Sequence, residues 1–417
     1  MRRIENIVMS IVMAAVGFSA LAFHLAAAVA PNVASVPTES ALENRYLASF
    51  PEVSAEAVLS GDVQRSLEDY LADHVPARDQ AALLNALLQR GSVAASALLC
   101  GYDTYPTFLG SRYYIVPRDG LIVDRAEEQP AEAGGKTLDA WVGTLNEAAR
   151  RHPDTRFVYD CVARHDQTEA NPTYRYYQNR LNPTWIQTNL INRLDPHISS
   201  FIDPVESYDE IVGEWFTADP HWTLQRALKS YGKVAQRLSL SAYAYDDSVE
   251  AVPSWQGEYA KNGLDLDYPL ALEDLPLDFT QLSFYELDED GGGPKQMGMR
   301  EAILGGDADM AAGHDSEYYR YFGGGGAVAV NAGPNNSRTA LFVGDSLSYC
   351  LTRFIAANYE RTMFLLPGNA RYNDSLESYI EHYAPDDVIV MMHATKYEMI
   401  AEYSPAFMGL ESSNTNH

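Results

Sequence analysis

Two short segments of the sequence hold residues that could together activate a hydroxyl group. Residues 343–346 read Val-Gly-Asp-Ser, directly after an apolar run. Asp219 and His221 stand on either side of Pro220, in a segment that reads Asp-Pro-His-Trp-Thr. A serine hydroxyl needs a neighbouring base at neutral pH, and an imidazole can serve when a carboxylate holds its other ring nitrogen. These residue types predict a nucleophile at Ser346, with His221 as its base and Asp219 as the carboxylate that orients the base.

Alternative roles exist for each part of this set. Ser346 could instead be a helix N-cap, a position that serine also favours. Two other histidines are rival bases, because His393 follows an apolar run near the C-terminus and His165, with Asp166, follows another. We favour His221 because Asp219 lies beside it in the chain.

Apolar runs and helical patterns alternate around both segments and must position them. We expect buried strands at residues 156–162, 198–202, 340–343, 363–366 and 388–392. Amphipathic helices are expected at 138–145, 185–191, 224–238, 347–358 and 376–383, the third of them capped by Thr223. Repeated strand–helix units predict an α/β fold, with a parallel sheet covered on both faces. Ser346 would then lie at the carboxyl end of a strand, where such sheets bind ligands.

The sequence divides into four regions. Within residues 1–30, an apolar stretch at 7–30 follows Arg2 and Arg3 and is long enough to span a bilayer, either as a signal anchor or as a cleaved signal peptide. Residues 31–62 are expected to form a linker and an extended lead-in, and residues 63–135 a helical region whose two helices join near Val75 and Pro76, followed by a turn. Residues 136–417 would form the main domain, with an irregular insertion containing some strands at about 239–338.

Charge and cysteine content exclude several functions. The net charge is −27, from 57 acidic and 30 basic residues, so we expect no binding to nucleic acid. Cys100, Cys161 and Cys350 lie far apart without metal-binding spacing, and two of them sit in apolar runs. We therefore expect buried free thiols at Cys161 and Cys350, with one disulfide as the alternative, and no metal or cofactor. An acidic run at 288–291 does not fit a calcium loop, because Met299 occupies the twelfth position.

The order of these motifs resembles that of the DHHW family and of the alginate O-acetyltransferase-like proteins in the SGNH superfamily. The resemblance rests first on the Asp-x-His-Trp-Thr and Gly-Asp-Ser segments. It extends to Tyr-Leu-Ala-Asp-His-Val-Pro-Ala-Arg-Asp at 70–79, Arg-Asp-Gly-Leu-Ile at 118–122 and Arg-Tyr-Asn at 371–373, and covers the chain from about residue 43 onward. Two departures are Pro220, where the family has a second histidine, and the glycine run 323–326, which lacks the family's asparagine.

This resemblance implies an SGNH-like, doubly wound parallel sheet and an extracytoplasmic O-acetyltransferase, anchored to the membrane by its N-terminal segment. Ser346 would take an acetyl group and pass it to a hydroxyl of a cell-surface or cell-wall polysaccharide. A membrane-bound O-acyltransferase is the implied partner that supplies the acetyl group. An acetylesterase of the same fold and a non-catalytic glycan-binding protein are the alternatives. Residues expected at the oxyanion or the substrate are Gly324, Gly325, Asn369, Arg371 and Tyr372, although Arg371 could instead form a structural salt bridge.

Overall fold

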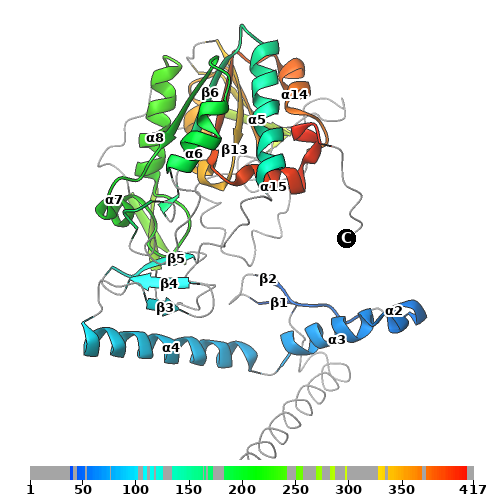
Figure 1. The fold of residues 1–417 in the computed structure, drawn as a ribbon, viewed down its shortest axis with the longest axis vertical. Helices are drawn as coiled ribbons and strands as arrows, with labels where there is room; N and C mark the ends of the chain where they lie inside the picture. The colour runs from blue at the N-terminus through cyan, green and yellow to red at the C-terminus, as the bar shows by residue number, and fades with distance from the viewer. Residues whose placement is uncertain are drawn as a thin grey trace, which may run out of the picture. The chain divides into compact units, whose positions relative to one another are not determined.

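The structure is a computed structural model. It describes residues 38–40, 45–51, 54–75, 77–101, 107–109, 113–116, 119–124, 134–162, 164–165, 168–171, 183–241, 250–256, 269–274, 282–286, 296–297, 327–333, 337–368 and 372–410. The chain divides into two compact units, and Figure 1 shows the elements of both. One unit holds Met1–Leu99 and Lys261–Leu266, and the other holds Cys100–Ala260 and Asp267–His417.

The first unit consists mainly of helices. Strands β1 (Glu39–Ser40) and β2 (Arg45–Tyr46) form a short antiparallel pair, followed by α2 (Ala55–Ser60), α3 (Asp62–Asp73) and α4 (Arg78–Cys100). The predicted junction of two helices near Val75 is confirmed, because α3 ends at Asp73 and α4 begins at Arg78. The apolar stretch at 7–30 lies outside the described residues. In the part of the chain that the structure describes, no helix has both the length and the hydropathy of a transmembrane span.

The motif at residues 70–79 holds the junction between α3 and α4. Asp73 accepts a hydrogen bond from the backbone N–H of Ala48 at 2.8 Å and pairs with Arg78 at 3.9 Å. The ring of His74 bonds through Nδ1 to the carbonyl oxygen of Tyr70 at 2.8 Å. The residues that resemble the family here therefore fix local structure within the first unit.

The second unit is built on an eight-stranded sheet with the order β11-β10-β12-β14-β13-β15-β6-β7. In this order its strands are Gln296–Met297, Leu282–Glu286, Ala327–Asn331, Arg361–Leu365, Thr339–Gly344, Asp387–His393, Arg156–Val162 and Ile198–Asp203. The run from β14 to β7 is parallel. Strands β12, β10 and β11 extend it in antiparallel fashion. The α/β class is confirmed, but the sheet is mixed rather than wholly parallel, as is common at the edge of a large sheet.

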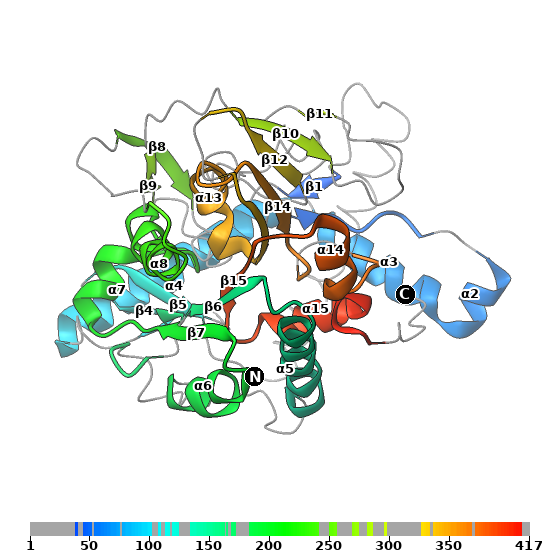
Figure 2. The same cartoon turned by 90° about the horizontal axis from the view of Figure 1, so that it is seen from above.

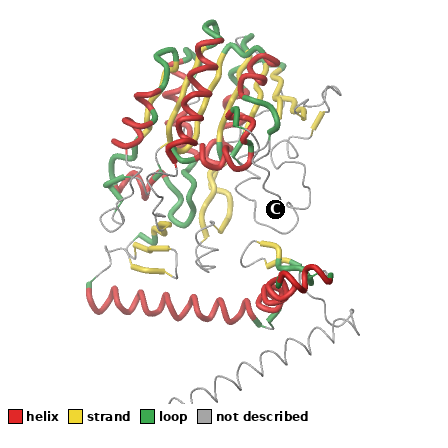
Figure 3. Tube along the Cα trace, turned by 45° about the vertical axis from the view of Figure 1, so that its right-hand side comes forward, coloured by secondary structure: helices red, strands yellow, loops and turns green. Residues whose placement is uncertain are grey.

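Both faces of this sheet are buried, so its central strands are apolar without interruption. On β13, Leu341 and Val343 face one hydrophobic cluster and Phe342 faces the other. The first face is covered by α5 (Gly134–Arg151), α6 (Pro183–Asn189), α14 (Leu376–Tyr383), α15 (Lys396–Tyr403) and the 3₁₀ turn η5 (Pro405–Met408). The second face is covered by α8 (Leu224–Arg237), the 3₁₀ turn η4 (Ser346–Leu351) and α13 (Thr352–Ala356). Figures 2 and 3 show the strands between these two helical layers.

Two smaller sheets complete the second unit. Strands β3 (Thr107–Leu109), β4 (Tyr113–Val116) and β5 (Leu121–Asp124) form an antiparallel sheet, and β8 (Glu250–Gln256) pairs with β9 (Pro269–Asp274). Within the interval 239–338, the described residues thus form β8 to β12, of which β10, β11 and β12 join the main sheet.

One predicted helix differs in a way that matters for the site. Residues 347–358 do not form a single amphipathic helix, because the 3₁₀ turn η4 precedes the short α13. The tighter turn follows from side-chain bonds at its start, where the Ser348 hydroxyl donates to the carbonyl oxygen of Asp345 at 2.6 Å. Hydroxyl bonds of this kind compete with regular helical bonding at the first turn.

Candidate active site

Ser346 lies immediately beyond the carboxyl end of β13, at the first position of η4. Gly344, two residues before Ser346, has a φ angle outside the left-handed region. Close packing, rather than an unusual backbone conformation, is therefore the reason that glycine is needed there. A Cβ atom on Gly344 would overlap the hydroxyl of Ser348 and would lie 2.5 Å from Cε1 of Phe342. Glycine therefore lets η4 fold back against the end of β13, so that the half-buried Ser346 stays at the strand end.

Asp345 fastens this turn to the neighbouring strand. Its carboxylate is fully buried and accepts the backbone N–H of Leu347 on Oδ1 at 3.0 Å. Its Oδ2 accepts the backbone N–H of His393, at the end of β15, at 2.9 Å. The N–H of Ser348 donates to the Asp345 carbonyl at 3.0 Å. The backbone N–H groups of Leu347 and Ser348, which follow Ser346, are therefore engaged inside the turn.

Asp219 and His221 lie in the loop between α7 (Tyr208–Glu214) and α8. The loop is a hairpin, because Trp215 and Trp222 form an antiparallel bridge and Phe216 N–H donates to the His221 carbonyl at 3.1 Å. Thr223 closes the hairpin and caps α8, as predicted, since its hydroxyl accepts the N–H of Arg226 at 3.4 Å.

The imidazole of His221 is held by Asp219. The distance from Nδ1 of His221 to Oδ1 of Asp219 is 2.6 Å, and the same oxygen accepts the backbone N–H of His221 at 2.9 Å. Asp219 is 1% exposed and His221 is 8% exposed, so water competes little for this bond. Because an ionised carboxylate only accepts hydrogen bonds, Nδ1 carries the proton and Nε2 is left as the basic nitrogen.

The two segments meet through the residue that follows each candidate catalytic residue. Nε1 of Trp222 donates to the carbonyl oxygen of Leu347 at 2.6 Å, and both side chains are buried. His221 precedes Trp222 and Ser346 precedes Leu347, so this bond brings the base loop to the carboxyl edge of β13. Helix α8 also packs against η4 within one hydrophobic cluster. The sequence-based expectation that these distant segments share one sheet edge agrees with this contact.

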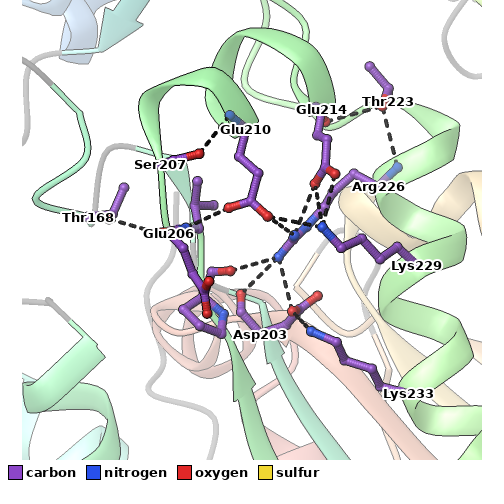
Figure 4. Close-up of polar contacts among 12 residues, drawn as sticks. Thr168, Asp203, Glu206, Ser207, Glu210, Glu214, Thr223, Arg226, Lys229 and Lys233 are labelled. Carbon is purple, nitrogen blue, oxygen red and sulfur yellow. Dashed lines mark hydrogen bonds and ion pairs between the residues drawn. The ribbon is translucent and has the colours of Figure 1, made fainter.

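A buried cluster of charges supports the base of the hairpin, and Figure 4 shows its members converging on one guanidinium. Arg226, in the first turn of α8, is 1% exposed. It pairs with Asp203 at the end of β7 at 3.0 Å and with Glu214 at the end of α7 at 3.1 Å. It also donates to the carbonyl of Pro204 at 3.0 Å. Arg226 thus ties the two helices that flank the hairpin to the sheet, because each partner comes from a different element.

The segment at residues 118–122 contacts the same hairpin. The backbone N–H of Ile122 in β5 donates to the carbonyl of Thr217 at 2.6 Å. The hydroxyl of Tyr208 in α7 donates to Asp119 at 2.7 Å. The segment that resembles the family's motif here therefore braces the loop that holds Asp219 and His221.

Both rival histidines lie in surroundings that differ from those of His221. His393 is at the same sheet edge, but its Nε2 is 3.8 Å from Asp345 and its Nδ1 bonds the Thr395 hydroxyl at 3.0 Å. Burial, and then the charges of Arg164, Lys396 and His221, hold the pKa of His393 well below its usual value. His165 is buried with its ring 5.1 Å from that of Trp215, and Asp166 lies outside the described residues. The ring of His221 is thus hydrogen-bonded to a carboxylate, whereas Nδ1 of His393 is bonded to a hydroxyl.

The residues expected at the oxyanion are largely outside the described residues. This holds for Gly324, Gly325, Asn369 and Arg371. Tyr372 is described, and it is a buried residue of the core beneath α14 and η5. Its hydroxyl accepts the N–H of Leu366 at 3.1 Å, just beyond β14, and its own N–H donates to Ser404 at 2.9 Å.

Sequence reasoning missed several residues that build the site. Asp345 was read only as part of the Gly-Asp-Ser tripeptide, and Lys396 and Arg226 were not singled out. A signal was present for Asp345, since a charged residue directly after a buried strand is rarely buried without a partner. Arg226 carried no such signal, because it lies outside the apolar stripe of Leu224, Ala227, Leu228 and Tyr231 in its helix. No local pattern marked Lys396.

Metal sites and disulfides can be judged for the described residues. No group of histidine, cysteine, aspartate and glutamate side chains there is arranged to hold a metal ion. All three cysteines are free thiols, with Cys161 and Cys350 buried as predicted and Cys100 exposed.

Several solved structures are similar to this chain. Bacillus cereus PatB1, solved with a sulfonyl adduct, gives a TM-score of 0.50 at 15% identity, over 69% of this chain and 96% of that chain. A DHHW family protein from Eubacterium siraeum gives a TM-score of 0.49 at 13% identity, over 70% of this chain and 95% of that chain. The O-acetyltransferase domain of Pseudomonas putida AlgJ gives a TM-score of 0.33 at 12% identity, over 70% of this chain and 95% of that chain.

The similar structures therefore include a DHHW family protein and an O-acetyltransferase domain, the groups that the sequence motifs resemble. No protein-family model matches the sequence, and no curated protein matches it. At such low identities the structural likeness shows the fold, so the chemistry must be argued from the residues of this chain.

Proposed function

We propose that this protein is an extracytoplasmic, serine-dependent O-acetyltransferase with an SGNH-like fold. It would move an acetyl group through Ser346 to hydroxyl groups of a cell-surface or cell-wall polysaccharide. One observation carries the proposal. The bond between Trp222 and Leu347 brings the loop of Asp219 and His221 to the strand end at Ser346. A hydroxyl, an imidazole and a carboxylate at one sheet edge are the groups that acyl transfer needs.

The chemistry of the proposed first step follows from the tautomer of His221. As the Ser346 hydroxyl oxygen attacks the acetyl carbonyl carbon, Nε2 of His221 takes its proton. The resulting imidazolium is stabilised by Asp219 through Nδ1. The tetrahedral intermediate expels the donor's alcohol oxygen, which takes the proton from Nε2, and an acetyl-serine remains.

The second step reverses the first with a sugar as the nucleophile. Nε2 of His221 takes a proton from a sugar hydroxyl while that oxygen attacks the acetyl-serine. The ester bond to Ser346 breaks, its oxygen regains the proton, and the acetylated sugar leaves. Water in place of the sugar would give an esterase, so the acceptor decides the outcome. Gly324, Gly325, Asn369 and Arg371 are the proposed sources of oxyanion or substrate contacts, because Leu347 and Ser348 already use their N–H groups within η4.

The same proposal covers location and partners. The apolar stretch at 7–30, preceded by Arg2 and Arg3, would cross the membrane and leave the remainder of the chain outside the cytoplasm. A membrane-bound O-acyltransferase would supply acetyl groups across the bilayer, and a cell-surface glycan would accept them. These assignments come from the sequence and from the chemistry of the site.

A sulfonyl reagent offers a direct test of the nucleophile, and the published form of PatB1 carries a sulfonyl adduct. Phenylmethanesulfonyl fluoride should modify Ser346 of the full-length protein, as identified by peptide mass spectrometry. Ser346→Ala should abolish both labelling and turnover of 4-nitrophenyl acetate. Asp219→Asn should lower kcat by about 10³- to 10⁴-fold, because it removes the ionised acceptor that sets the imidazole tautomer.

An exposed carboxylate provides the matched control for the Asp219 variant. Asp209→Asn, in α7, makes the same chemical change away from the imidazole and should keep full activity. Acetylated product that appears only with an added oligosaccharide would establish transfer, whereas acetate release unaffected by the oligosaccharide would establish an esterase. Full activity and labelling of Ser346→Ala would refute the enzyme proposal and favour a glycan-binding protein.

A further inference from the structure

A buried lysine lies at the same sheet edge and takes no part in the proposed reaction. Lys396 is the first residue of α15, just after β15, and is 3% exposed. Lysine is seldom buried, because removing its charge from water is unfavourable. Its ammonium group donates to Sδ of Met399 at 3.3 Å, a weak acceptor, and it forms no ion pair with any carboxylate among the described residues.

The order of the strands determines where this side chain runs. A Cβ on Gly368, just beyond β14, would overlap Cε of Lys396 and would lie 3.0 Å from its Cδ. The lysine stem therefore starts beyond β15 and reaches the backbone beyond β14. Strand β13 lies between these two strands in the sheet. Lys396 thus crosses the carboxyl end of β13, where Asp345 and Ser346 stand, and glycine at 368 leaves the space for it.

Asp345 is the charged group beneath this crossing. Its two carboxylate oxygens accept one N–H from the nucleophile turn, at Leu347, and one from β15, at His393. Both bonds require acceptor oxygens, so they are strongest while the carboxyl group is ionised. Burial raises the pKa of Asp345, and the charge of Lys396 is the largest influence that opposes this rise.

We propose that Lys396 is a positioning residue for Ser346 that acts through Asp345, because its ammonium compensates the buried carboxylate that fastens the nucleophile turn to β15. The inference rests on the proposed function, in which Ser346 is the nucleophile. Lys396 itself touches neither substrate nor reacting atoms in this scheme. It acts by keeping both hydrogen bonds of Asp345 in place.

The other ionisable groups around Asp345 do not replace this charge. From β6, Tyr159 and Cys161 face it, and burial raises the pKa of both, so they are neutral at neutral pH. From β15, His393 faces it as a neutral imidazole, because burial lowers its pKa. Besides Lys396, His221 is a basic group that lowers the pKa of Asp345, but its ring already serves Asp219. Lys396 is therefore the cation available to Asp345 from the described elements packed around it.

Removal of the ammonium has a defined consequence for the pH profile. In Lys396→Met the apolar stem remains, but the pKa of Asp345 rises further, so its carboxyl group gains a proton at a higher pH. The protonated oxygen is a weaker acceptor for the N–H group, so one attachment of the turn at Ser346 is weakened. We expect the acidic limb of kcat for 4-nitrophenyl acetate to move to higher pH, with KM little changed. At neutral pH kcat should fall by about 10- to 100-fold, the range expected for a misplaced nucleophile.

Three variants separate this role from simple packing. Lys396→Arg keeps the charge and should restore the acidic limb toward that of the wild type. Lys136→Met removes an exposed lysine of α5 and should change nothing. In a double-mutant cycle with Asp345→Asn, Lys396→Met should have almost no further effect, because the group through which it acts is already uncharged. Thermal unfolding checks that each variant folds. If Lys396→Met does not fold, the neutral variant Lys396→Gln is compared with the charged variant Lys396→Arg instead.

Two results would overturn the inference. The first is that Lys396→Met, or Lys396→Gln where that variant replaces it, has the same kcat and the same acidic limb of the pH profile as the wild type. The other is an equal loss in the wild-type and Asp345→Asn backgrounds, which would mean that Lys396 acts independently of Asp345. The Ser346→Ala and sulfonyl fluoride experiments distinguish these from a failure of the proposed function. If Ser346 is labelled and required while Lys396→Met behaves as wild type, only the role of Lys396 is wrong.

Discussion

Replacing Trp222 with phenylalanine should separate the hydrogen bond between the two candidate catalytic segments from the packing around it. The indole of Trp222 is fully buried, and its Nε1 donates to the Leu347 carbonyl at 2.6 Å. Phenylalanine keeps an aromatic ring but cannot donate. The Leu347 oxygen still accepts from the Cys350 thiol at 3.5 Å. Loss of one buried bond costs about 1–2 kcal/mol of unfolding free energy.

Trp215 provides the control for the change in ring size. It is also buried, forms the opposite side of the hairpin bridge, and its ring centroid is 5.9 Å from that of Trp222. Its Nε1 has no hydrogen-bond partner in the described structure. Trp215→Phe therefore removes a similar volume without removing a hydrogen bond. The difference between the two variants measures the bond to Leu347.

The expected difference can be read in stability and in rate. At about 2–4 °C per kcal/mol for a unit of this size class, Trp222→Phe should melt roughly 2–8 °C below Trp215→Phe. Its kcat for an acetyl ester should fall by about 10- to 100-fold more, because the base loop is no longer fixed to the nucleophile turn. Circular dichroism melting and steady-state kinetics give both values. Equal melting temperatures and equal kcat in the two variants would refute the role assigned to this bond.

Two further predictions concern buried groups of the second unit. Burial, and then the charge of Asp203, raise the pKa of Asp160 to about 8 from 3.8, so its contribution to stability is complete below about pH 4 and is lost as the pH rises to about 8. Asp160→Asn keeps an acceptor for the Ser230 hydroxyl. Its free energy of unfolding, relative to that of the wild type, should therefore increase between pH 5 and pH 8 by up to about 5 kcal/mol. A difference in melting temperature that does not change with pH would contradict this. Gly344→Ala should destabilise the protein by about 1–3 kcal/mol, because the new Cβ would overlap Ser348 and Phe342. As a control, Gly143→Ala in α5 should stabilise it slightly, because a Cβ there meets nothing within 4 Å. A higher melting temperature for Gly344→Ala than for Gly143→Ala would show that Gly344 has room for a side chain.

The buried charges around the hairpin suggest why this loop can be precise without being part of the sheet. Arg226 joins β7, α7 and α8, and Lys229 pairs with Glu214 at 3.0 Å on the more exposed side. Breaking a buried pair leaves an uncompensated charge, so the arrangement resists local opening even where its net contribution to stability is small. The position of Asp219 and His221 is then set by groups outside the loop itself.

Much of the element order was determined by the sequence alone. The expected strand at 156–162 and helix at 376–383 are β6 and α14 with the same bounds, and the strands β13 and β15 differ from their expected ranges by one residue at each end. These elements could be predicted because periodicity and uninterrupted apolar runs are local properties of the chain. The same is true of the Thr223 cap and of the short spacing that lets Asp219 hold His221.

The tertiary structure alone decided how those elements meet. Nothing local indicates that β13 lies between β14 and β15, that three antiparallel strands extend the sheet, or that Lys396 crosses its edge. In the sequence the Gly-Asp-Ser segment reads equally as a cap or as a nucleophile, and only the structure shows that Trp222 bonds Leu347 and that the N–H of His393 bonds Asp345. Strand order and such contacts join residues far apart in the chain, 125 positions for Trp222 and Leu347 and 231 positions for Arg156 and Asp387. They depend on which surfaces bury one another, a property that no short stretch of sequence contains.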